Sequence, residues 1–383
     1  MTPAAVLAWV EQERQRSVRW RSESGSAAPR RVQLADDTLT ADAAFRLASE
    51  GTGLLWRGDF QNARQLLQAL ARRADRKPRN AGRPEAVEAG AAFHRYRMQQ
   101  GQRARILAML LIELEGDYAV KLRRAPDLRL ACSQAWGPAD GQPSVASLRE
   151  LLGLVGAHEW RKKGVEIAAL GPPPTNRIHA HYGVFSPVRG EYIDLVASAP
   201  LPATDLAFDI GTGTGVLAAV LARRGGQRVV ATDQDQRALA CARDNVSRLG
   251  LQDRIEVIQA DLFPPGQAAL VVCNPPWVPG RPSSPIEHAV YDDGSRMLRG
   301  FLLGLSAHLV TRGEGWLILS DLAEHLGLRS RAQLLEWIDA AGLKVLARCE
   351  ARPRHPKATD PDDPLHAARS REVTSLWRLA LRE

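Results

Sequence analysis

Between residues 206 and 381, short apolar runs alternate with stretches of helical spacing, and this alternation constrains the fold more than any other feature. Seven runs have the length of strands: 206–209, 228–232, 255–258, 270–273, 316–319, 344–349 and 374–381. Helical stretches lie among them at 216–223, 236–249, 296–310 and 331–341. Because strand–helix alternation forms right-handed βαβ units, we predict an α/β fold with a doubly wound, mostly parallel seven-stranded sheet. The last two strands, joined without a helix, are expected to pair antiparallel at one edge.

The fourth strand runs directly into Asn274, Pro275, Pro276 and Trp277. Ligands of open α/β sheets bind at the carboxyl ends of the strands. Two successive prolines cannot continue a β-ladder, so the chain must turn there and expose the Pro275 carbonyl. That carbonyl and the Asn274 side-chain oxygen are two acceptors beside the flat face of Trp277, a set that suits a planar NH2 group. Taken alone, the four residues also fit a proline-rich surface turn with a half-buried tryptophan.

A glycine-rich loop joins the first strand to its helix. Its residues are Asp209, Ile210, Gly211, Thr212, Gly213, Thr214 and Gly215. Glycines permit a tight turn and let a ligand lie against the backbone. The spacing differs from the G-x-G-x-x-G fingerprint of dinucleotide sites. The preceding Asp209 would repel a pyrophosphate but could hold the amine of an amino-acid-like ligand. By itself, the loop is compatible with a nucleotide cofactor or with no ligand.

Carboxylates also follow the second and third strands. Asp233 ends the second strand, where it can accept hydrogen bonds from both hydroxyls of a ribose. Asp261 ends the third strand, where it can accept from an exocyclic adenine NH2 while Leu262 covers the ring. Each acid alone is more often a helix cap or a surface residue. Four consecutive strands that all end in such residues favour a nucleoside-containing cofactor.

The block from Asp209 to Trp277 resembles the class I S-adenosylmethionine-dependent methyltransferases that carry an N-P-P-[FYW] motif. Residues 181–186, H-Y-G-V-F-S, resemble the G-V-F-S segment of the small-domain methyltransferases that modify guanine in ribosomal RNA. Glu287 and residues 289–294, A-V-Y-D-D-G, resemble the stretch after N-P-P-Y in the release-factor glutamine N5-methyltransferases. Trp277 replaces the usual Tyr or Phe, and residues 292–294 match only approximately. The resemblance covers residues 181–383 and specifies a cofactor and a nitrogen acceptor, but no particular substrate.

This resemblance implies S-adenosylmethionine as the cofactor and an in-line displacement of its sulfonium methyl by an NH2 nitrogen. For that chemistry, position and polar complementarity matter more than a strong general base. The cofactor-binding residues that it implies are Asp209, Gly211, Thr212, Gly213, Thr214, Gly215, Asp233, Asp261, Leu262 and Asn274. The implied catalytic residues, which hold the acceptor, are Asn274, Pro275, Pro276 and Trp277. Phe185 and Trp277 are expected to contact the substrate.

The positive charge of the chain lies in its first half. Residues 1–180 hold 28 Lys and Arg against 19 Asp and Glu, a net charge of +9, whereas residues 181–383 have a net charge of −1. We therefore predict a basic N-terminal domain for substrate recognition at 1–175 and a methyltransferase domain at 176–383. A solvated basic face, as in many Arg-rich proteins, is the alternative. The G-P-P-P sequence at 171–174 is the predicted linker.

The N-terminal domain is expected to be mostly helical. Helices are predicted over residues 4–21, after an N-cap at Asp59, from Pro84 onward, and around the apolar stripe at 107–114. The helix after Asp59 would place four residues on one face: Phe60, Ala63, Leu67 and Leu70. Four arginines would lie on solvated faces, at Arg95, Arg97, Arg103 and Arg105.

The four cysteines, Cys132, Cys241, Cys273 and Cys349, are isolated and lack C-x-x-C spacing. This pattern favours a reducing, cytoplasmic location and argues against a zinc site or another metal centre. The first residues lack the basic segment and cleavage site of a signal peptide. The longest apolar run, at 106–114, is too short to span a bilayer. We therefore expect a cytoplasmic protein without a membrane partner.

Two substrates fit the acceptor slot. The first hypothesis is nucleic acid, most of all ribosomal RNA, because phosphate neutralisation by the basic half would favour binding. Residues Arg352, Arg354, His355 and Lys357 could add contacts, with a solvated loop as the alternative. The second hypothesis is a glutamine in a translation protein, a release factor or a ribosomal protein, favoured by the segment after Trp277. A non-catalytic binder that kept the cofactor pocket is a third class, which the intact Asn274 and Asp233 disfavour.

Overall fold

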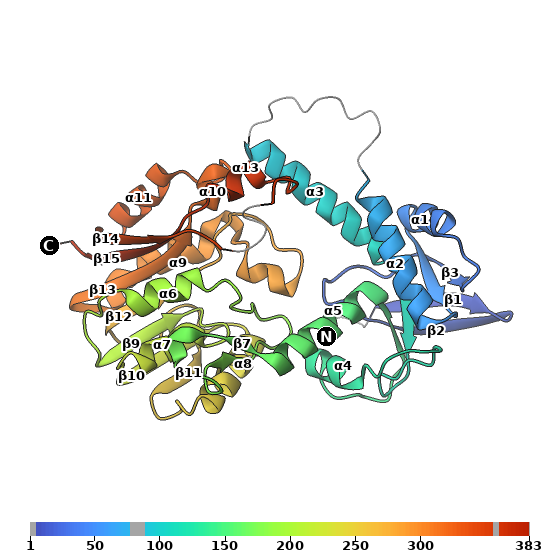
Figure 1. Ribbon diagram of the computed structural model, residues 1–383, viewed down its shortest axis with the longest axis horizontal. Helices are drawn as coiled ribbons and strands as arrows, with labels where there is room; N and C mark the ends of the chain where they lie inside the picture. Colours follow the sequence, from blue (N-terminus) through green and yellow to red (C-terminus); the bar gives the residue numbers. More distant parts are fainter. Residues whose placement is uncertain (1–4, 77–88, 355–359, 383) are drawn as a thin grey trace. The chain divides into compact units, whose positions relative to one another are not determined.

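The computed structural model of the chain describes residues 5–76, 89–354 and 360–382, except the side chains of Ala89 and Pro285. The chain forms two compact units, which are described separately (Figure 1). The first unit contains residues 1–87 and 94–159, and the second contains residues 88–93 and 160–383. The change at residue 160 comes before the predicted boundary at 176, and the predicted linker at 171–174 lies inside the second unit.

The first unit contains a six-stranded sheet in the order β1-β2-β6-β5-β4-β3. Its strands are β1 (Val6–Glu11), β2 (Arg14–Trp20), β3 (Arg31–Ala35), β4 (Thr52–Trp56), β5 (Leu110–Leu114) and β6 (Ser144–Ser147). The β1–β2 and β5–β6 pairs are antiparallel, and the other three pairs are parallel. The helices of this unit are α1 (Ala41–Ser49), α2 (Phe60–Ala74) and α4 (Arg129–Trp136). Two more helices, α3 (Ala89–Leu107) and α5 (Leu148–Lys163), contain residues of both units.

The prediction of a mostly helical N-terminal domain is wrong. Residues 4–21 were expected to form one helix, but residues 6–20 form the β1–β2 hairpin, in which the buried Leu7 and Trp9 alternate with exposed neighbours. Its turn residues, Gln12 and Glu13, have φ values of 50° and 60°, as the common two-residue hairpin turns require. The stripe at 107–114 splits into the end of α3 and the buried strand β5. A short apolar run does not distinguish a buried strand from a buried helix by its spacing.

The helix predicted after Asp59 is confirmed as α2. The Asp59 side chain accepts a hydrogen bond from the backbone N–H of Gln61, and this N-cap starts the helix. The four residues predicted to share a face, Phe60, Ala63, Leu67 and Leu70, are buried together with Leu66. The helix start predicted at Pro84 lies outside the described residues.

The second unit contains the predicted seven-stranded sheet, in the order β11-β10-β9-β12-β13-β15-β14. Its strands are β9 (Leu206–Ile210), β10 (Arg228–Asp233), β11 (Ile255–Gln259), β12 (Ala268–Cys273), β13 (Leu309–Ser320), β14 (Leu343–Ala351) and β15 (Thr374–Leu381). The five strands from β11 to β13 are parallel, and β15 is antiparallel to both of its neighbours. The α/β prediction and its antiparallel edge are confirmed.

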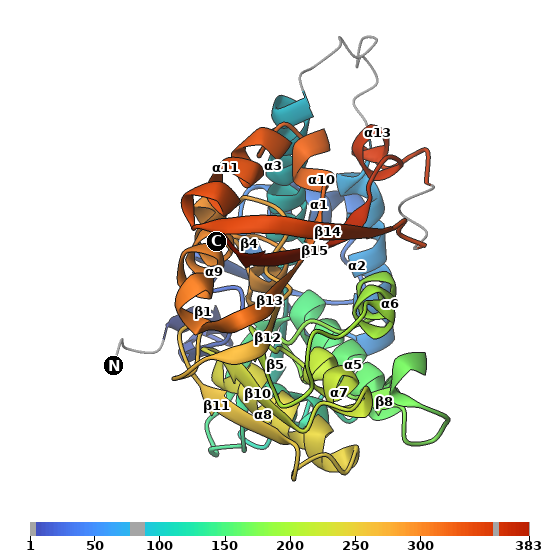
Figure 2. The ribbon, with the colours of Figure 1, turned by 90° about the vertical axis from the view of Figure 1, so that its left-hand side faces the viewer.

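Helices cover both faces of this sheet (Figure 2). The helices are α6 (Glu191–Ser198), α7 (Val216–Arg223), α8 (Gln236–Arg248), α9 (Arg296–His308), α10 (Leu322–His325), α11 (Arg331–Ala340) and α13 (His366–Arg369). The remaining short elements are β7 (Val165–Glu166), β8 (Arg177–Ile178), η1 (Ala168–Leu170), η2 (Pro285–Ala289) and η3 (Asp293–Ser295). In the described part of the chain, no helix combines the length and the apolar character needed to cross a membrane.

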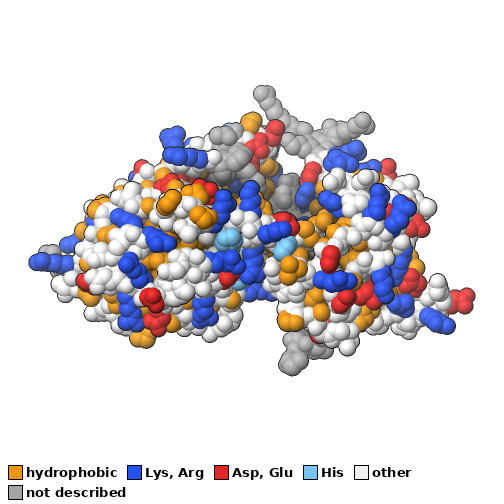
Figure 3. All heavy atoms as spheres, turned by 60° about the horizontal axis from the view of Figure 1, so that its bottom comes forward, with side chains coloured by type: hydrophobic (Ala, Val, Ile, Leu, Met, Phe, Trp, Pro, Cys, Tyr) orange, Lys and Arg blue, Asp and Glu red, His pale blue; other side chains and the backbone are white. Residues whose placement is uncertain are grey.

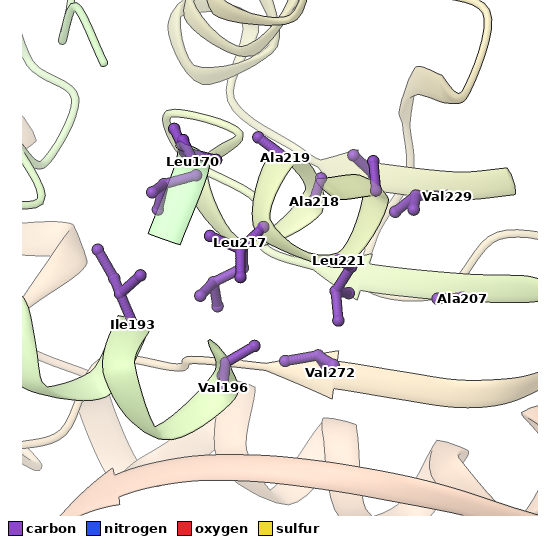
Figure 4. Packing of buried hydrophobic residues seen from close by; sticks show 14 of the residues in the cluster. Leu170, Ile193, Val196, Ala207, Leu217, Ala218, Ala219, Leu221, Val229 and Val272 are labelled. Atoms are coloured by element: carbon purple, nitrogen blue, oxygen red, sulfur yellow. The ribbon is translucent and has the colours of Figure 1, made fainter. Parts of the chain in front are cut away.

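Alternate residues of the central strands enter two different cores. On one face, Val272 of β12 packs with Leu217 and Leu221 of α7 and Val196 of α6 (Figure 4). On the other face, Val271 packs in a cluster with residues of α9 and α11. Burial on both faces explains the continuous apolar runs of these strands. It also leaves only the strand ends free to present polar groups.

Candidate functional site

The glycine-rich loop leaves β9 and leads into α7. Gly211, Gly213 and Gly215 have φ values of +70°, +54° and +80°, a region that favours glycine. A Cβ added at Gly211 would lie 2.5 Å from Cε of Met297 in α9, so the Met297 side chain lies directly against the loop at Gly211. The backbone N–H of Thr212 donates to the Thr232 carbonyl of β10 over 2.8 Å. The loop therefore lies along the end of the neighbouring strand.

Asp209, in β9, stabilises this loop through hydrogen bonds to the loop and to α7. It is 1% exposed, and its Oδ2 accepts hydrogen bonds from Thr212 Oγ1 at 2.6 Å and from the Ala218 N–H at 3.0 Å. Burial raises the pKa of this carboxyl to about 6, because desolvation disfavours its charged form. The hydrogen bonds that Asp209 makes are directed at the loop and at α7. Its expected contact with the cofactor amine stays a prediction.

Asp233 connects the ends of β9 and β10. Its Oδ2 accepts from the Gly213 N–H, and its Oδ1 accepts from the Asp235 N–H, both at 3.0 Å. Burial raises the pKa of Asp233 as well. In the described part of the chain, neither Asp209 nor Asp233 pairs with a Lys or Arg. A buried carboxylate such as Asp209, or a half-buried one such as Asp233, without a cationic partner is typical of functional sites.

The end of β11 lies beside Asp233. The Ala260 N–H donates to the Asp233 carbonyl at 3.1 Å, and Thr232 Oγ1 donates to the Leu262 carbonyl at 2.6 Å. Asp261 is exposed and Leu262 is half-buried with a φ of +74°. The structure thus brings together the residues that were predicted at three strand ends.

The N-P-P-W turn lies next to the glycine-rich loop. Cys273, the last residue of β12, pairs with Ile210, the last residue of β9, so Asn274 and Gly211 leave the sheet side by side. The indole N–H of Trp277 donates to Oδ1 of Asn274 at 2.8 Å, and no hydrogen bond among the described residues uses the Pro275 carbonyl. The Trp277 ring is half-buried and packs against both cores. Neither Phe nor Tyr could donate this ring N–H.

Residues 289–294 hold the turn from the other side. Val278 forms a parallel bridge with Tyr291, and the Asp292 N–H donates to the Val278 carbonyl at 3.0 Å. The Asp292 carboxylate accepts from the N–H groups of Met297 and Leu298, both at 3.1 Å, at the start of α9. Met297 is the residue beside Gly211. A continuous set of contacts therefore links the glycine-rich loop to the N-P-P-W turn.

The segment at 181–186 is attached to α8. Val184 is buried against Ala238 and Cys241, and His181 Nε2 lies 3.0 Å from an Asp244 carboxylate oxygen. Phe185 follows Val184 and is half-buried. Its predicted contact with a substrate stays a prediction.

Sequence reasoning missed Arg189. Its guanidinium lies 5.2 Å from the centroid of the Trp277 ring and forms ion pairs with Glu191 and Glu372. The same arginine lines a pocket of about 770 Å³ together with Glu191, Asp194, Glu350, Arg352 and Arg354. No motif in the sequence connects residue 189 with 277 or 372. His355 and Lys357, which were grouped with Arg352 and Arg354, lie outside the described residues.

Much of the positive charge of the first unit is neutralised locally. Arg57 pairs with Glu11 and Glu113, and Arg103, which was predicted to lie on a solvated face, forms a solvent-exposed ion pair with Asp75. In the view of Figure 3, Lys and Arg side chains of this unit lie among Asp and Glu side chains.

Among the described residues, no group of three or more His, Cys, Asp and Glu could hold a metal ion. The four cysteines are unpaired.

Known proteins resemble the part of the chain that holds this site. The profile of the methyltransferase small-domain family matches residues 175–302. A tRNA1(Val) (adenine(37)-N6)-methyltransferase of Shewanella amazonensis is 30% identical over 168 residues, which cover 40% of this chain and 72% of that protein. A release factor glutamine methyltransferase of Cereibacter sphaeroides is 30% identical over 161 residues, which cover 38% of this chain and 56% of that protein.

A ribosomal protein L11 methyltransferase of Pelotomaculum thermopropionicum is 45% identical over 69 residues, 18% of this chain and 22% of that protein. The chain spans 22% and 44% of the length of this enzyme and of its Vibrio cholerae counterpart. The family match includes the glycine-rich loop, the acids after β10 and β11 and the N-P-P-W turn. The chain therefore belongs to the class I S-adenosylmethionine-dependent methyltransferases with a methyltransferase small domain.

Proposed function

We propose that the protein transfers a methyl group from S-adenosylmethionine to a planar amino nitrogen, and that this nitrogen is an exocyclic amino group of a base in ribosomal RNA. One observation carries the proposal. The Asn274 and Pro275 acceptors and the Trp277 ring leave β12 directly beside the glycine-rich loop that leaves β9. An acceptor held by that turn would lie next to a cofactor held by that loop.

The residues around the loop fit this cofactor. Asp233 has no cationic partner in the described structure, so its carboxylate is suited to accept from the ribose hydroxyls. Asp261 would accept from the adenine amino group, with Leu262 against the ring. The backbone from Gly211 to Gly215, which includes Thr212 and Thr214, would lie along the amino-acid end, supported by Asp209. When bound, S-adenosylmethionine supplies an electrophilic methyl group.

The turn would orient the acceptor nitrogen. An amide oxygen has two lone pairs, so Asn274 Oδ1 can accept from the acceptor while it accepts from the Trp277 N–H. Asn274 Oδ1 and the Pro275 carbonyl would each accept a hydrogen bond from one N–H of the NH2 group. The nitrogen lone pair would then point away from these oxygens, toward the methyl group of the cofactor. Both oxygens would also stabilise the positive charge that develops on the nitrogen. The proton can then leave to water.

Two observations favour RNA as the substrate. The relative that this chain covers most completely among those described above is named as an adenine N6-methyltransferase of tRNA. The first 180 residues have a net charge of +9, which would favour binding to phosphates. A paired base would have to flip out to reach Trp277, with Phe185 beside it. The unpaired cysteines are consistent with a reducing, cytoplasmic location.

A glutamine in a translation protein is the second candidate. It is favoured by the match to a release factor glutamine methyltransferase and by residues 289–294, which pack directly against the N-P-P-W turn. The two candidates differ in where the methyl group goes. Purified protein and tritium-labelled S-adenosylmethionine would be added to an extract of cells that lack the protein. We expect label in the RNA fraction, and label in the protein fraction alone would support the second candidate.

The role of the turn is tested with Asn274→Ala. We expect transfer to fall by at least about 100-fold, because one of the two oriented acceptors is lost. Binding of S-adenosylhomocysteine, measured by calorimetry, should weaken by no more than about tenfold, since one implied contact from Asn274 is lost while the glycine-rich loop and Asp233 are intact. Asn62→Ala in α2 of the first unit is the matched control and should keep full activity. Normal transfer by Asn274→Ala would contradict the proposed function.

A further inference from the structure

We propose that Arg189 is a positioning residue of the acceptor slot, the site formed by Asn274, Pro275 and Trp277. Arg189 holds the Trp277 ring in the orientation in which the ring N–H donates to Asn274 Oδ1. This inference rests on the proposed function. Arg189 lies just before α6, outside every motif described above. It acts through the ring and need not touch the acceptor.

Two buried carboxylates fix the Arg189 guanidinium. Its Nε donates to Oε1 of Glu191 and its Nη2 donates to Oε1 of Glu372, both at 3.1 Å. Glu191 is 8% exposed and Glu372 is 2% exposed, so water competes little for these contacts. Glu372 is itself held by Ser320 Oγ, which donates to the same oxygen at 2.7 Å. Charge-assisted hydrogen bonds of this kind are short and directional.

The fixed guanidinium then holds the ring. Because the in-plane N–H groups point to the carboxylates, the flat face is available for the indole, whose centroid lies 5.2 Å from Cζ. A planar cation over a tryptophan face is a favourable contact. A second contact constrains the same ring: its indole N–H donates a hydrogen bond to Asn274 Oδ1. Arg189 and Asn274 thus constrain the ring further, beyond its packing against the two cores.

The charges of this cluster are also suited to methyl transfer. A free cation beside the slot would oppose the positive charge that develops on the acceptor nitrogen. Two carboxylates more than neutralise Arg189. The guanidinium can therefore orient the ring without an electrostatic penalty at the nitrogen. Position matters strongly here, since a displacement of about 1 Å can lower a rate by about 100-fold.

The first test compares two Arg→Lys substitutions. Arg189→Lys keeps a positive charge for the two carboxylates but lacks the planar face. The Cζ atom of Arg299 lies 5.6 Å from the centroid of the Trp337 ring, so Arg299→Lys removes the same kind of stacking on a different tryptophan of the same unit. With tritium transfer to the fraction that the wild type labels, we expect Arg189→Lys to lower kcat by about 10- to 100-fold and to change KM by less than about threefold. Arg299→Lys should stay within about twofold of the wild type.

The second test is a double-mutant cycle with Trp277→Phe, which removes the ring N–H. If Arg189 acts through the indole, Arg189→Lys should lower kcat by less than about threefold when it is combined with Trp277→Phe. An undiminished effect in that combination would mean that Arg189 acts only on the fold, and would overturn the proposal. If Arg189→Lys does not fold, the double variant Arg189→Met/Glu372→Gln replaces it in the test. This variant removes one buried carboxylate together with the cation, so it leaves less unpaired charge in the interior. A wild-type kcat in this variant would contradict the positioning role of Arg189.

The two proposals fail in different ways. If the wild-type protein labels neither RNA nor protein, the proposed function is wrong and this inference falls with it. If the wild type is active and Arg189→Lys has the wild-type kcat, only the positioning role is wrong.

Discussion

Each unit of the molecule buries a carboxylate near the start of a helix. One of these carboxylates is paired with arginines, whereas the other accepts hydrogen bonds only from neutral groups among the described residues. In the first unit, Asp59 caps α2 and also accepts hydrogen bonds from Arg123 and Arg124, at 2.8 and 2.7 Å. In the second unit, Asp209 precedes α7 and accepts only from the neutral groups of Thr212 and Ala218 among the described residues. The hydrogen bond from Arg124 lowers the pKa of Asp59, whereas burial raises the pKa of Asp209 to about 6.

This difference distinguishes a carboxylate that serves stability from one that belongs to a binding site. A paired acid lowers the free energy of the folded state, because its charge is compensated. An uncompensated buried acid costs stability, and such a cost is typical of sites that bind or react. We therefore propose that Asp209 and Asp233 belong to the site in the second unit, whereas the ion-paired Asp59 of the first unit stabilises the fold. Three substitutions to asparagine test the contrast.

The largest effect is expected for Asp209→Asn, in the dependence of stability on pH. In the unfolded chain this carboxyl loses its proton near 3.8, whereas in the folded protein it keeps the proton up to about pH 6. The folded state binds more protons across this window, so stability falls as the pH rises through it. The loss amounts to roughly 3 kcal/mol. Urea unfolding at pH 4 and pH 7 should show most of this loss in the wild type and a smaller loss in Asp209→Asn, and an equal loss of unfolding free energy in the two proteins would contradict the contrast.

The second effect is expected on cofactor affinity. Asp233→Asn should raise the Kd for S-adenosylhomocysteine by about 10- to 100-fold, because a charged acceptor for the ribose hydroxyls becomes neutral. Isothermal titration calorimetry measures this change directly. Asp59→Asn is the matched control and should leave the Kd unchanged. If both variants bound alike, the proposed role of Asp233 would be wrong.

The smallest effect is expected for Asp59→Asn, on thermal stability alone. The pKa of Asp59 is held below its ordinary value of 3.8, so the stabilisation from its charge is present above about pH 4 and is lost as the pH falls. The variant should melt roughly 5 °C lower than the wild type at pH 7. The gap should narrow on acidification, which is opposite in sign to the behaviour of Asp209→Asn. Melting curves at pH 3.5 and pH 7 measure this difference in melting temperature between the wild type and Asp59→Asn. An equal difference at both pH values would contradict the role of the Asp59 charge.

The two units also differ in how far their folds could be predicted. In the second unit, Val216–Arg223 and Thr374–Leu381 agree with the prediction at both ends, where Gly215 precedes the helix and the charged Arg382 follows the strand. In the first unit, the buried strand β5 was taken as part of a helix, since Leu110, Leu111 and Leu114 share a helical spacing by coincidence. Only β-pairing with β4 and β6 decides between the two.

The candidate site was predicted in the same unequal way. Gly211, Asp233, Asp261 and Asn274 follow consecutive strands, and parallel strands bring their carboxyl ends together, so their convergence could be read from their order. The bond between Trp277 and Asn274 is local, but no spacing rule predicts a ring N–H that occupies the acceptor oxygen.

The order of strands and helices in residues 206–381, and with it the position of the loops that form the site, was determined by the sequence by itself. Local apolar spacing and strand-end residues suffice for this, because a parallel α/β sheet permits few topologies. Only the tertiary structure decided the surroundings of Trp277. Arg189 and Glu372 are 183 residues apart in the chain, and their contact exists because α6 and the segment before β15 pack on the same region of the sheet. Such a contact depends on the packing of whole elements, which no local pattern encodes.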